Sequence, residues 1–205
     1  MEKIKLFIAD IDLANAHHHF LLKNISEEQK QKALRFKNEK DQLRSLLSSY
    51  LVNQLSKEEL KKNPTGKPYF EHGPYFNISH SGKYVVMAVS SHEVGIDIEE
   101  NVDKDMSMLI KIFNEAEGKM IKEHADFYYL WCAKESLIKC MGSSINKIKE
   151  IPSLPLNGLK TFKGIDYQCQ TFILDKHIIS LTNQSKEPFE IDIINVSKIP
   201  FAFQI

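Results

Sequence analysis

VGIDIE, residues 94–99, places two carboxylates two positions apart in a chain of 205 residues. Successive side chains of a β-strand point to opposite faces, so Asp97 and Glu99 would share one face and Ile96 and Ile98 the other. The pattern therefore predicts a strand with an apolar face packed on a core. Two neighbouring acids make half of a site for a hard divalent cation, although a half-buried edge strand with a polar face has the same pattern.

A third acid lies in LWCAKESLIK, residues 130–139. Glu135 and Lys139 are four positions apart and would lie on the same side of a helix, as in many surface ion pairs. Together with the two acids of VGIDIE, they supply the oxygen ligands and the cation for phosphate that a Mg²⁺-dependent phosphoryl-transfer site needs. Lys134 falls inside the apolar arc of this helix, where its stem reaches the rim or its ammonium pairs with an acid or a phosphate.

Composition and charge narrow the class of protein. Lys and Arg number 27, as do Asp and Glu, so the net charge gives no case for binding to nucleic acid or to a membrane surface. The three cysteines form no C-x-x-C pair, which argues against a disulfide framework or a zinc site. The apolar runs are too short to span a bilayer, and the first residues lack the apolar region of a signal peptide. We expect a cytoplasmic protein.

Periodicity and capping signals predict an α+β fold in two halves. The expected helices cover residues 26–37, 40–55, 115–123 and 127–141, the last stopped by Gly142. The expected strands cover residues 4–10, 75–78, 84–90, 94–99, 167–174, 177–182 and 189–196, with a polar break at residues 79–82. The acidic stretch 100–105 reads as a connector, so we place the halves at residues 1–101 and 102–205.

Other polar segments have functional and ordinary interpretations. NISHSG, residues 77–82, is either a common polar loop or an anion cradle of hydroxyls, an imidazole and backbone N–H groups. The lysine-rich segment 23–67 is either a solvated helical surface or a basic region that faces a ligand with several phosphates. We interpret the run from His17 to His19 as a solvent-exposed loop patch.

In combination and order, these segments resemble the Sfp-type 4′-phosphopantetheinyl transferases. The resemblance covers about residues 4–141 and is carried by GKP, FNISHS, GIDIE and WCAKESLIK, at residues 66–68, 76–81, 95–99 and 131–139, with support from IS at 25–26, RF at 35–36 and RS at 44–45. Four spaced motifs make a chance match very improbable. The resemblance implies two similar α+β halves related by a pseudo-two-fold axis, with the active site in the cleft between them and a monomer as the working unit.

The resemblance also implies a reaction and a metal site. Members of this family transfer the phosphopantetheine arm of coenzyme A to a serine of an apo carrier protein and release adenosine 3′,5′-bisphosphate. By this resemblance, Asp97, Glu99 and Glu135 bind Mg²⁺ together with oxygens of the pyrophosphate. Glu135 is also the candidate general base towards the serine, directly or through a water, although metal binding weakens a carboxylate as a base. Lys139 would contact the phosphoryl group that is transferred.

The coenzyme-binding residues follow from the same resemblance. Ser79 and His80 would hold phosphates of coenzyme A, and Lys67, Arg44 and Lys32 would meet its 3′-phosphate and adenine end. One departure concerns the turn after Lys139, where the family often has a Gly-x-Gly-like sequence and this chain has only Gly142. It bears on the exit of the pantetheine arm and leaves the metal site unaffected.

Two alternatives use the same residues differently. A Mg²⁺-dependent phosphohydrolase would direct water at the phosphorus of coenzyme A or a nucleotide, and a binding module for coenzyme A or a carrier would perform no chemistry. The three acids and Lys139 argue against the binding module, whereas the phosphohydrolase would use the same acids. Which carrier is served, whether fatty-acid, polyketide or peptide-synthetase, does not follow from the sequence, nor does acceptance of acylated coenzyme A.

Overall fold

The computed structural model describes residues 1–105, 109–152 and 157–201. Within these ranges the helices are α1 (Ile11–Ala16), α2 (His18–Lys23), α3 (Glu27–Leu34), α4 (Glu39–Asn53), α5 (Glu115–Met120) and α6 (His124–Cys140), with short 3₁₀ turns η1 (Ile110–Ile112) and η2 (Ile145–Lys147). The strands are β1 (Glu2–Asp10), β2 (Lys61–Lys62), β3 (Pro68–Tyr69), β4 (Tyr75–Ser81), β5 (Tyr84–Ser90), β6 (Val94–Glu100), β7 (Asn157–Phe162), β8 (Ile165–Leu174), β9 (His177–Asn183) and β10 (Phe189–Val196).

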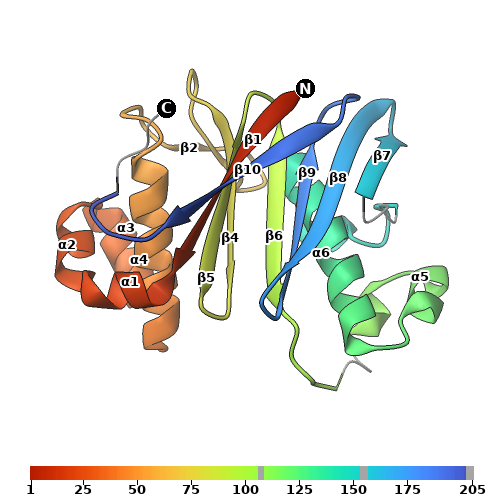
Figure 1. Cartoon of the computed structure of the whole chain (residues 1–205), viewed down its shortest axis with the longest axis horizontal. Coiled ribbons are helices and arrows are strands. Elements are labelled where there is room, and N and C mark those ends of the chain that lie inside the picture. The colour runs from red at the N-terminus through yellow and green to blue at the C-terminus, as the bar shows by residue number, and fades with distance from the viewer. Residues whose placement is uncertain (106–108, 153–156, 202–205) are drawn as a thin grey trace.

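Two four-stranded sheets organise the chain, and helices cover the outer side of each (Figure 1). The first sheet has the order β10-β1-β5-β4 and the second has the order β6-β9-β8-β7. Strand β10 runs parallel to β1, whereas the other neighbours within the two sheets are antiparallel. Helices α1–α4 lie beside the first sheet, and α5 and α6 lie on the side of the second sheet. The fold is therefore α+β, as predicted.

Alternating side chains of each sheet enter different cores. Along β1, Ile4, Leu6 and Ile8 face the second sheet, whereas Phe7 and Ala9 face the helices α1 and α4. The layer between the sheets is closed from the other side by apolar residues of β6 and β9: Val94, Ile96, Ile98, Ile179 and Leu181. A third core joins α6 to β8 and β9.

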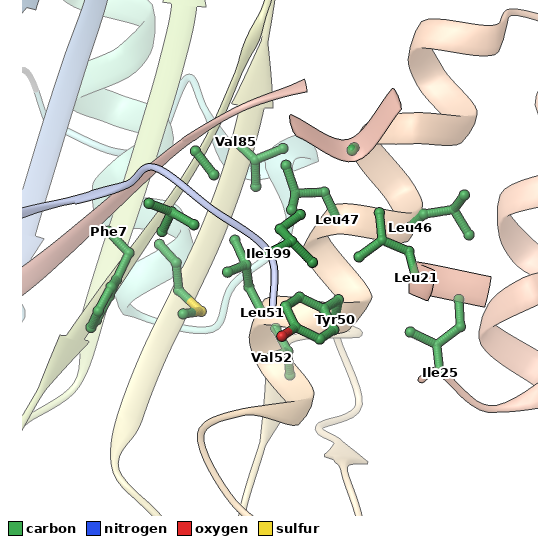
Figure 2. Close-up of a cluster of buried hydrophobic side chains, with 14 of the residues drawn as sticks. Phe7, Leu21, Ile25, Leu46, Leu47, Tyr50, Leu51, Val52, Val85 and Ile199 are labelled. Atoms are coloured by element: carbon green, nitrogen blue, oxygen red, sulfur yellow. The ribbon is translucent and has the colours of Figure 1, made fainter. Parts of the chain in front are cut away.

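The core under α4 holds the first half together. Figure 2 shows Leu47 and Leu51 of α4 turned towards the sheet, where Phe7 and Val85 lie. Tyr50 fixes the far end of the chain to this helix, because its hydroxyl donates to the carbonyl of Phe201 (3.0 Å) and accepts from the backbone N–H of the same residue (2.8 Å). These contacts place α4 firmly on the first sheet, which matters because Arg44 extends from this helix.

Each half of the chain contributes one strand to the sheet that is built mainly from the other half. Strand β6 precedes the boundary that we placed between residues 101 and 102, yet it pairs with β9 of the second sheet. Strand β10 follows the boundary and pairs with β1 of the first sheet. These two pairings cross the boundary and interlock the two halves. The domain limits 1–101 and 102–205 stay a prediction.

The helical signals of the sequence are confirmed. Ser26 and Gln29 form the expected capping box of α3, with the backbone N–H of Gln29 donating to Ser26 Oγ and that of Ser26 donating to Gln29 Oε1. Asn114 caps α5 in the same way. Gly142 follows the end of α6 with φ +56, the left-handed conformation that glycine tolerates best.

Three expectations differ from the structure. Residues 79–81 continue strand β4 and do not form a polar break, because their backbone pairs with residues 84–86 of β5. The run from His17 to His19 is the junction of α1 and α2 rather than a loop patch, and neither helix was predicted. Strand β7 was also missed.

None of the helices in the described ranges combines the length and the apolarity that a membrane span requires.

Candidate active site

Strand β6 turns its two acids towards α6, as the alternation of VGIDIE predicts. Ile96 and Ile98 are buried between the sheets, whereas Asp97 meets Lys139 of α6 on the opposite face. Asp97 is 2% exposed, so its charge lies almost entirely inside the protein. A buried carboxylate needs partners, and those partners define the site.

Gly95 allows α6 to approach this strand closely. A Cβ atom on Gly95 would lie 2.0 Å from the carbonyl oxygen of Ser136 and 2.3 Å from the backbone nitrogen of Cys140. These are backbone atoms of α6, so a side chain at position 95 would force the helix away from β6. The glycine of VGIDIE thus sets the distance between the strand that carries Asp97 and the helix that carries Glu135.

Three carboxylates from these two elements converge. Asp97, Glu99 and Glu135 each place an oxygen so that the three atoms lie within 4.8 Å of one another. The ammonium of Lys139 lies 2.6 Å from Asp97 Oδ1 and 3.8 Å from Glu135 Oε2. Among the described residues, Lys139 pairs directly with two of the three acids, and the charge of Lys104 also acts on Glu99, so the three carboxylates outnumber the cations near them.

Burial and mutual repulsion shift the pKa values of the cluster. Desolvation, followed by the charge of Asp97, raises the pKa of Glu135 to about 8. The same two causes raise the pKa of Glu99, opposed by a hydrogen bond from Ser81. Burial opposes the charge of Lys139, but Asp97 and Glu135 outweigh it and raise the pKa of the ammonium. Burial and the neighbouring acids therefore oppose ionisation of Glu135, and a further cation at the cluster would favour its charged form.

The donor set fits a hard divalent cation. Oxygen Oδ2 of Asp97 is buried and has no hydrogen-bond partner among the described residues, although buried carboxylate oxygens are normally bonded. The candidate ligands are all carboxylate oxygens, the type that Mg²⁺ prefers. A bound cation would satisfy that oxygen and relieve the repulsion among the three acids. The residues predicted as metal ligands are thus brought together.

Strand β4 borders the site and joins the two sheets through its side chains. Ser79 Oγ donates to Asp97 Oδ1 (3.0 Å) and accepts from the ammonium of Lys139 (3.0 Å). Ser81 Oγ donates to Glu99 Oε2 (2.9 Å). Asn77 Oδ1 accepts from the backbone N–H of Ile96 (2.9 Å). These alternate residues of β4 replace a backbone ladder between the edge strands of the two sheets, and they fix the acids of β6 in place.

Arg44 and His80 lie near one another beside this seam. The guanidinium of Arg44 donates to the carbonyl of Gly82 in the β4–β5 turn and pairs with Asp41 at 2.5 Å. Desolvation by the surrounding protein, followed by the charge of Arg44, lowers the pKa of the His80 imidazole, although the residue as a whole is exposed. Arg44 and His80 thus put a cation and a neutral hydrogen-bonding ring at one end of the site.

The two predicted lysines of the N-terminal half have different surroundings. Lys32 is exposed on α3, and its contact with a coenzyme stays a prediction. The side chain of Lys67 is 11% exposed, and its ammonium contacts Glu93, the carbonyl of Val94 and the carbonyl of Cys140. Lys67 also lines a pocket of about 450 Å³ together with aromatic side chains, among them Tyr69, Phe70 and Tyr75.

Two contributors escaped the sequence analysis. Asn77 was part of a quoted motif, but its bond to Ile96 was not predicted, because nothing local marks a partner that is 19 positions away. Glu117 is the partner of Lys134, whose ammonium lies 2.6 and 2.7 Å from its two oxygens. The signal for Glu117 was the position of Lys134 within an apolar arc, for which an acidic partner was one of the interpretations left open.

Comparison with known proteins identifies the family. Residues 93–194 match the family described as the 4′-phosphopantetheinyl transferase superfamily, and residues 14–92 match 4′-phosphopantetheinyl transferase, N-terminal. The 4′-phosphopantetheinyl transferase Sfp of Bacillus subtilis (strain 168) is 32% identical over 192 residues, which cover 85% of this chain and 83% of that protein. The chain belongs to the 4′-phosphopantetheinyl transferase superfamily.

Two other relatives support the same family assignment. The 4′-phosphopantetheinyl transferase gsp of Aneurinibacillus migulanus is 37% identical over 142 residues, 62% of this chain and 60% of that protein. The 4′-phosphopantetheinyl transferase ffp of Bacillus subtilis is 31% identical over 172 residues, 76% of this chain and 74% of that protein. The two family matches divide between residues 92 and 93, just before the strand that carries Asp97.

Proposed function

We propose that this chain transfers the 4′-phosphopantetheine arm of coenzyme A to a serine hydroxyl of an apo carrier protein, with release of adenosine 3′,5′-bisphosphate. The convergence of Asp97, Glu99 and Glu135 beside Lys139, in a member of this superfamily, is the observation that carries the proposal. In the transfer, a bond forms between the serine oxygen and the β-phosphorus, and the bond from that phosphorus to the bridging oxygen of the pyrophosphate breaks.

Three acids would hold Mg²⁺ in this proposal: Asp97, Glu99 and Glu135. When bound, the cation would neutralise charge on the pyrophosphate and on the leaving bisphosphate. Support comes from the unpartnered oxygen Oδ2 of Asp97 and from the excess of negative charge in the cluster. The metal requirement is testable by dialysis against EDTA, after which transfer should stop and added Mg²⁺ should restore it.

The protein groups have separate roles. Lys139 would bind the phosphoryl group that is transferred, since its ammonium lies beside Asp97 and Glu135 of the acidic cluster. Ser79 and His80 would bind phosphate oxygens, and Arg44 would bind the 3′-phosphate. The serine proton would pass to Glu135, directly or through a water. Metal binding competes with this role, because a carboxylate that is bound to a cation is a weaker base.

The proposal includes a cytoplasmic monomer that uses coenzyme A and an apo carrier and needs neither nucleic acid nor a membrane. The three buried thiols, which form no disulfide, favour a reducing compartment. Because the site takes Asp97 from β6 and Glu135 from α6 of the same chain, one chain supplies its predicted metal ligands.

The decisive experiment separates transfer from hydrolysis. The protein is incubated with coenzyme A, Mg²⁺ and a panel of apo carriers of fatty-acid, polyketide and peptide-synthetase type, and intact mass is measured for each carrier. We expect at least one carrier to gain the phosphopantetheine arm. Consumption of coenzyme A with every carrier unmodified would favour a phosphohydrolase. No consumption and no modification, with coenzyme A bound, would favour a binding module.

A further inference from the structure

The turn of residues 63–67 lies against the C-terminal end of α6. Asn63 Oδ1 shapes the turn by accepting from the backbone N–H groups of Thr65 (3.0 Å) and Lys67 (2.8 Å). Thr65 Oγ1 then reaches the carbonyl of Gly142 at 2.6 Å. The approach is close, since a Cβ atom on Gly142 would lie 2.7 Å from the side-chain nitrogen Nδ2 of Asn63.

The ammonium of Lys67 completes this contact. It lies 2.5 Å from Glu93 Oε2, 3.1 Å from the carbonyl of Val94 and 3.0 Å from the carbonyl of Cys140. An ammonium has three N–H donors, and here each one has an acceptor. The side chain thereby connects the start of β6, through Val94, to the end of α6, through Cys140.

A cation at the C-terminal end of α6 stabilises the last backbone carbonyls of the helix. Backbone N–H groups of residues 141–143 bond to the carbonyls of Leu137, Lys139 and Ile138 and close the helix with a left-handed glycine turn. The carbonyl of Cys140 receives the ammonium of Lys67. A positive charge at this end also interacts favourably with the helix dipole.

We infer that Lys67 is a positioning residue, which holds β6 and α6 in the register where Asp97, Glu135 and Lys139 meet. Its two backbone contacts lie three residues before Asp97 and one residue after Lys139. Contact with the 3′-phosphate of a coenzyme would require Lys67 to leave a carboxylate and two carbonyls, each of which would lose a donor. The inference rests on the proposed transfer, and it replaces phosphate binding as the role of this side chain.

Coenzyme A and 3′-dephospho-coenzyme A distinguish the two roles. We expect Lys67→Met to lower kcat/KM at least tenfold, mainly through kcat, and by the same factor with both coenzymes. The partner variant Glu93→Gln should change both values in the same direction, and the double variant should lose less than the product of the two single losses. A loss for Lys67→Met with coenzyme A alone would overturn the inference, because it would mark Lys67 as a ligand of the 3′-phosphate.

Hydrogen–deuterium exchange tests the contact between Lys67 and the end of α6 without substrate. In Lys67→Met, the backbone amides of residues 141–143 should exchange at least tenfold faster, whereas those of β1 should keep their protection. Unchanged exchange at residues 141–143 would overturn the inference. Should Lys67→Met not fold, Glu93→Gln is measured in its place with the same criteria. Failure of the wild-type protein to modify any carrier would refute the proposed function, and the exchange experiment would still test the contact.

Discussion

Lys134 and Glu135 are neighbours on α6, and they belong to two different ionic arrangements. Lys134 faces the carboxylate of Glu117, both side chains are almost fully buried, and both carboxylate oxygens lie within 2.7 Å of the ammonium. Glu135 belongs to a group of three acids that share the single ammonium of Lys139. The two arrangements differ in burial, since the side chains of Lys134 and Glu117 are 0% and 3% exposed and those of Lys139 and Glu135 are 26% and 20% exposed. They also differ in charge balance, because one ammonium faces one carboxylate in the first and three carboxylates gather in the second, which can accept a further cation.

The balanced pair has a structural consequence. Glu117 lies in α5 and is 2% exposed, and the ring of Phe113 lies 5.7 Å from the ammonium of Lys134. The pair therefore ties α5 to the helix that carries the active-site acid. Glu135 points instead towards β6, where the acids are held by hydroxyls of β4. One residue step along α6 separates a structural contact from a reactive one.

The largest expected effect comes from the unbalanced cluster. Asp97→Ala should lower the transfer rate by about a thousandfold or more, the scale expected when an electrostatic group at a reacting centre is removed. Its melting temperature should stay close to that of the wild-type protein, because the substitution also removes repulsion among three acids. Carrier modification by mass spectrometry and thermal unfolding are the measurements. Full activity would refute the metal assignment.

The balanced pair should respond in the opposite way. Lys134→Met removes the ammonium that neutralises the buried carboxylate of Glu117 and should lower the free energy of unfolding by about 3–5 kcal/mol. The double variant with Glu117→Leu should recover part of that loss, since an apolar pair can replace a buried ion pair, but Glu117→Leu also removes the acceptor for the backbone N–H of Asn114. Denaturant unfolding measures stability, and the rate per folded molecule should be nearly unchanged in the double variant. A double variant as unstable as the single one would contradict this account.

Gly95→Ala tests whether the spacing between β6 and α6 matters. The new Cβ atom would overlap backbone atoms of Ser136 and Cys140, so the helix must shift. We expect a loss of about 1–3 kcal/mol in stability, the usual range for overpacking. Transfer should fall further than this loss of folded protein explains, because Glu135 moves with the helix. Gly118→Ala is the control, since its Cβ atom would meet only a side-chain methyl at 3.3 Å.

The smallest effect should come from an exposed pair on α5. Lys119 and Glu115 lie 2.6 Å apart, but their side chains are 73% and 85% exposed. Lys119→Ala should change the free energy of unfolding by no more than about 0.5 kcal/mol, because water screens the pair. A change as large as that of Lys134→Met would mean that burial and balance do not explain the comparison above.

Local signals explain what the sequence predicted correctly. Alternation in VGIDIE predicted the two faces of β6, and capping residues such as Ser26 and Asn114 predicted where helices begin. The position of Lys134 within an apolar arc left two interpretations, a stem that reaches the rim or an ammonium with an ionic partner, and the structure shows the second. These features depend on residues within a few positions of one another, so one sequence is enough to recognise them.

Long-range pairing explains what was missed. Ser79 and Ser81 were assigned to a polar break, yet both extend β4 by pairing with β5, and their hydroxyls bond to acids of β6 that lie 18 positions away. The role of Gly95 depends on the backbone of α6, and that of Lys67 depends on its three acceptors. Such partners are selected by the tertiary structure, and no local pattern of residues encodes them.

The exchange of β6 and β10 between the sheets has a consequence for splitting the chain. A fragment of residues 1–101 would carry β6 without its neighbour β9, and a fragment of residues 102–205 would carry β10 without β1. Each piece would present an unpaired edge that invites aggregation. We expect the two fragments to be insoluble when made separately and to regain activity when co-expressed, so unfolding of either half should entail unfolding of the other.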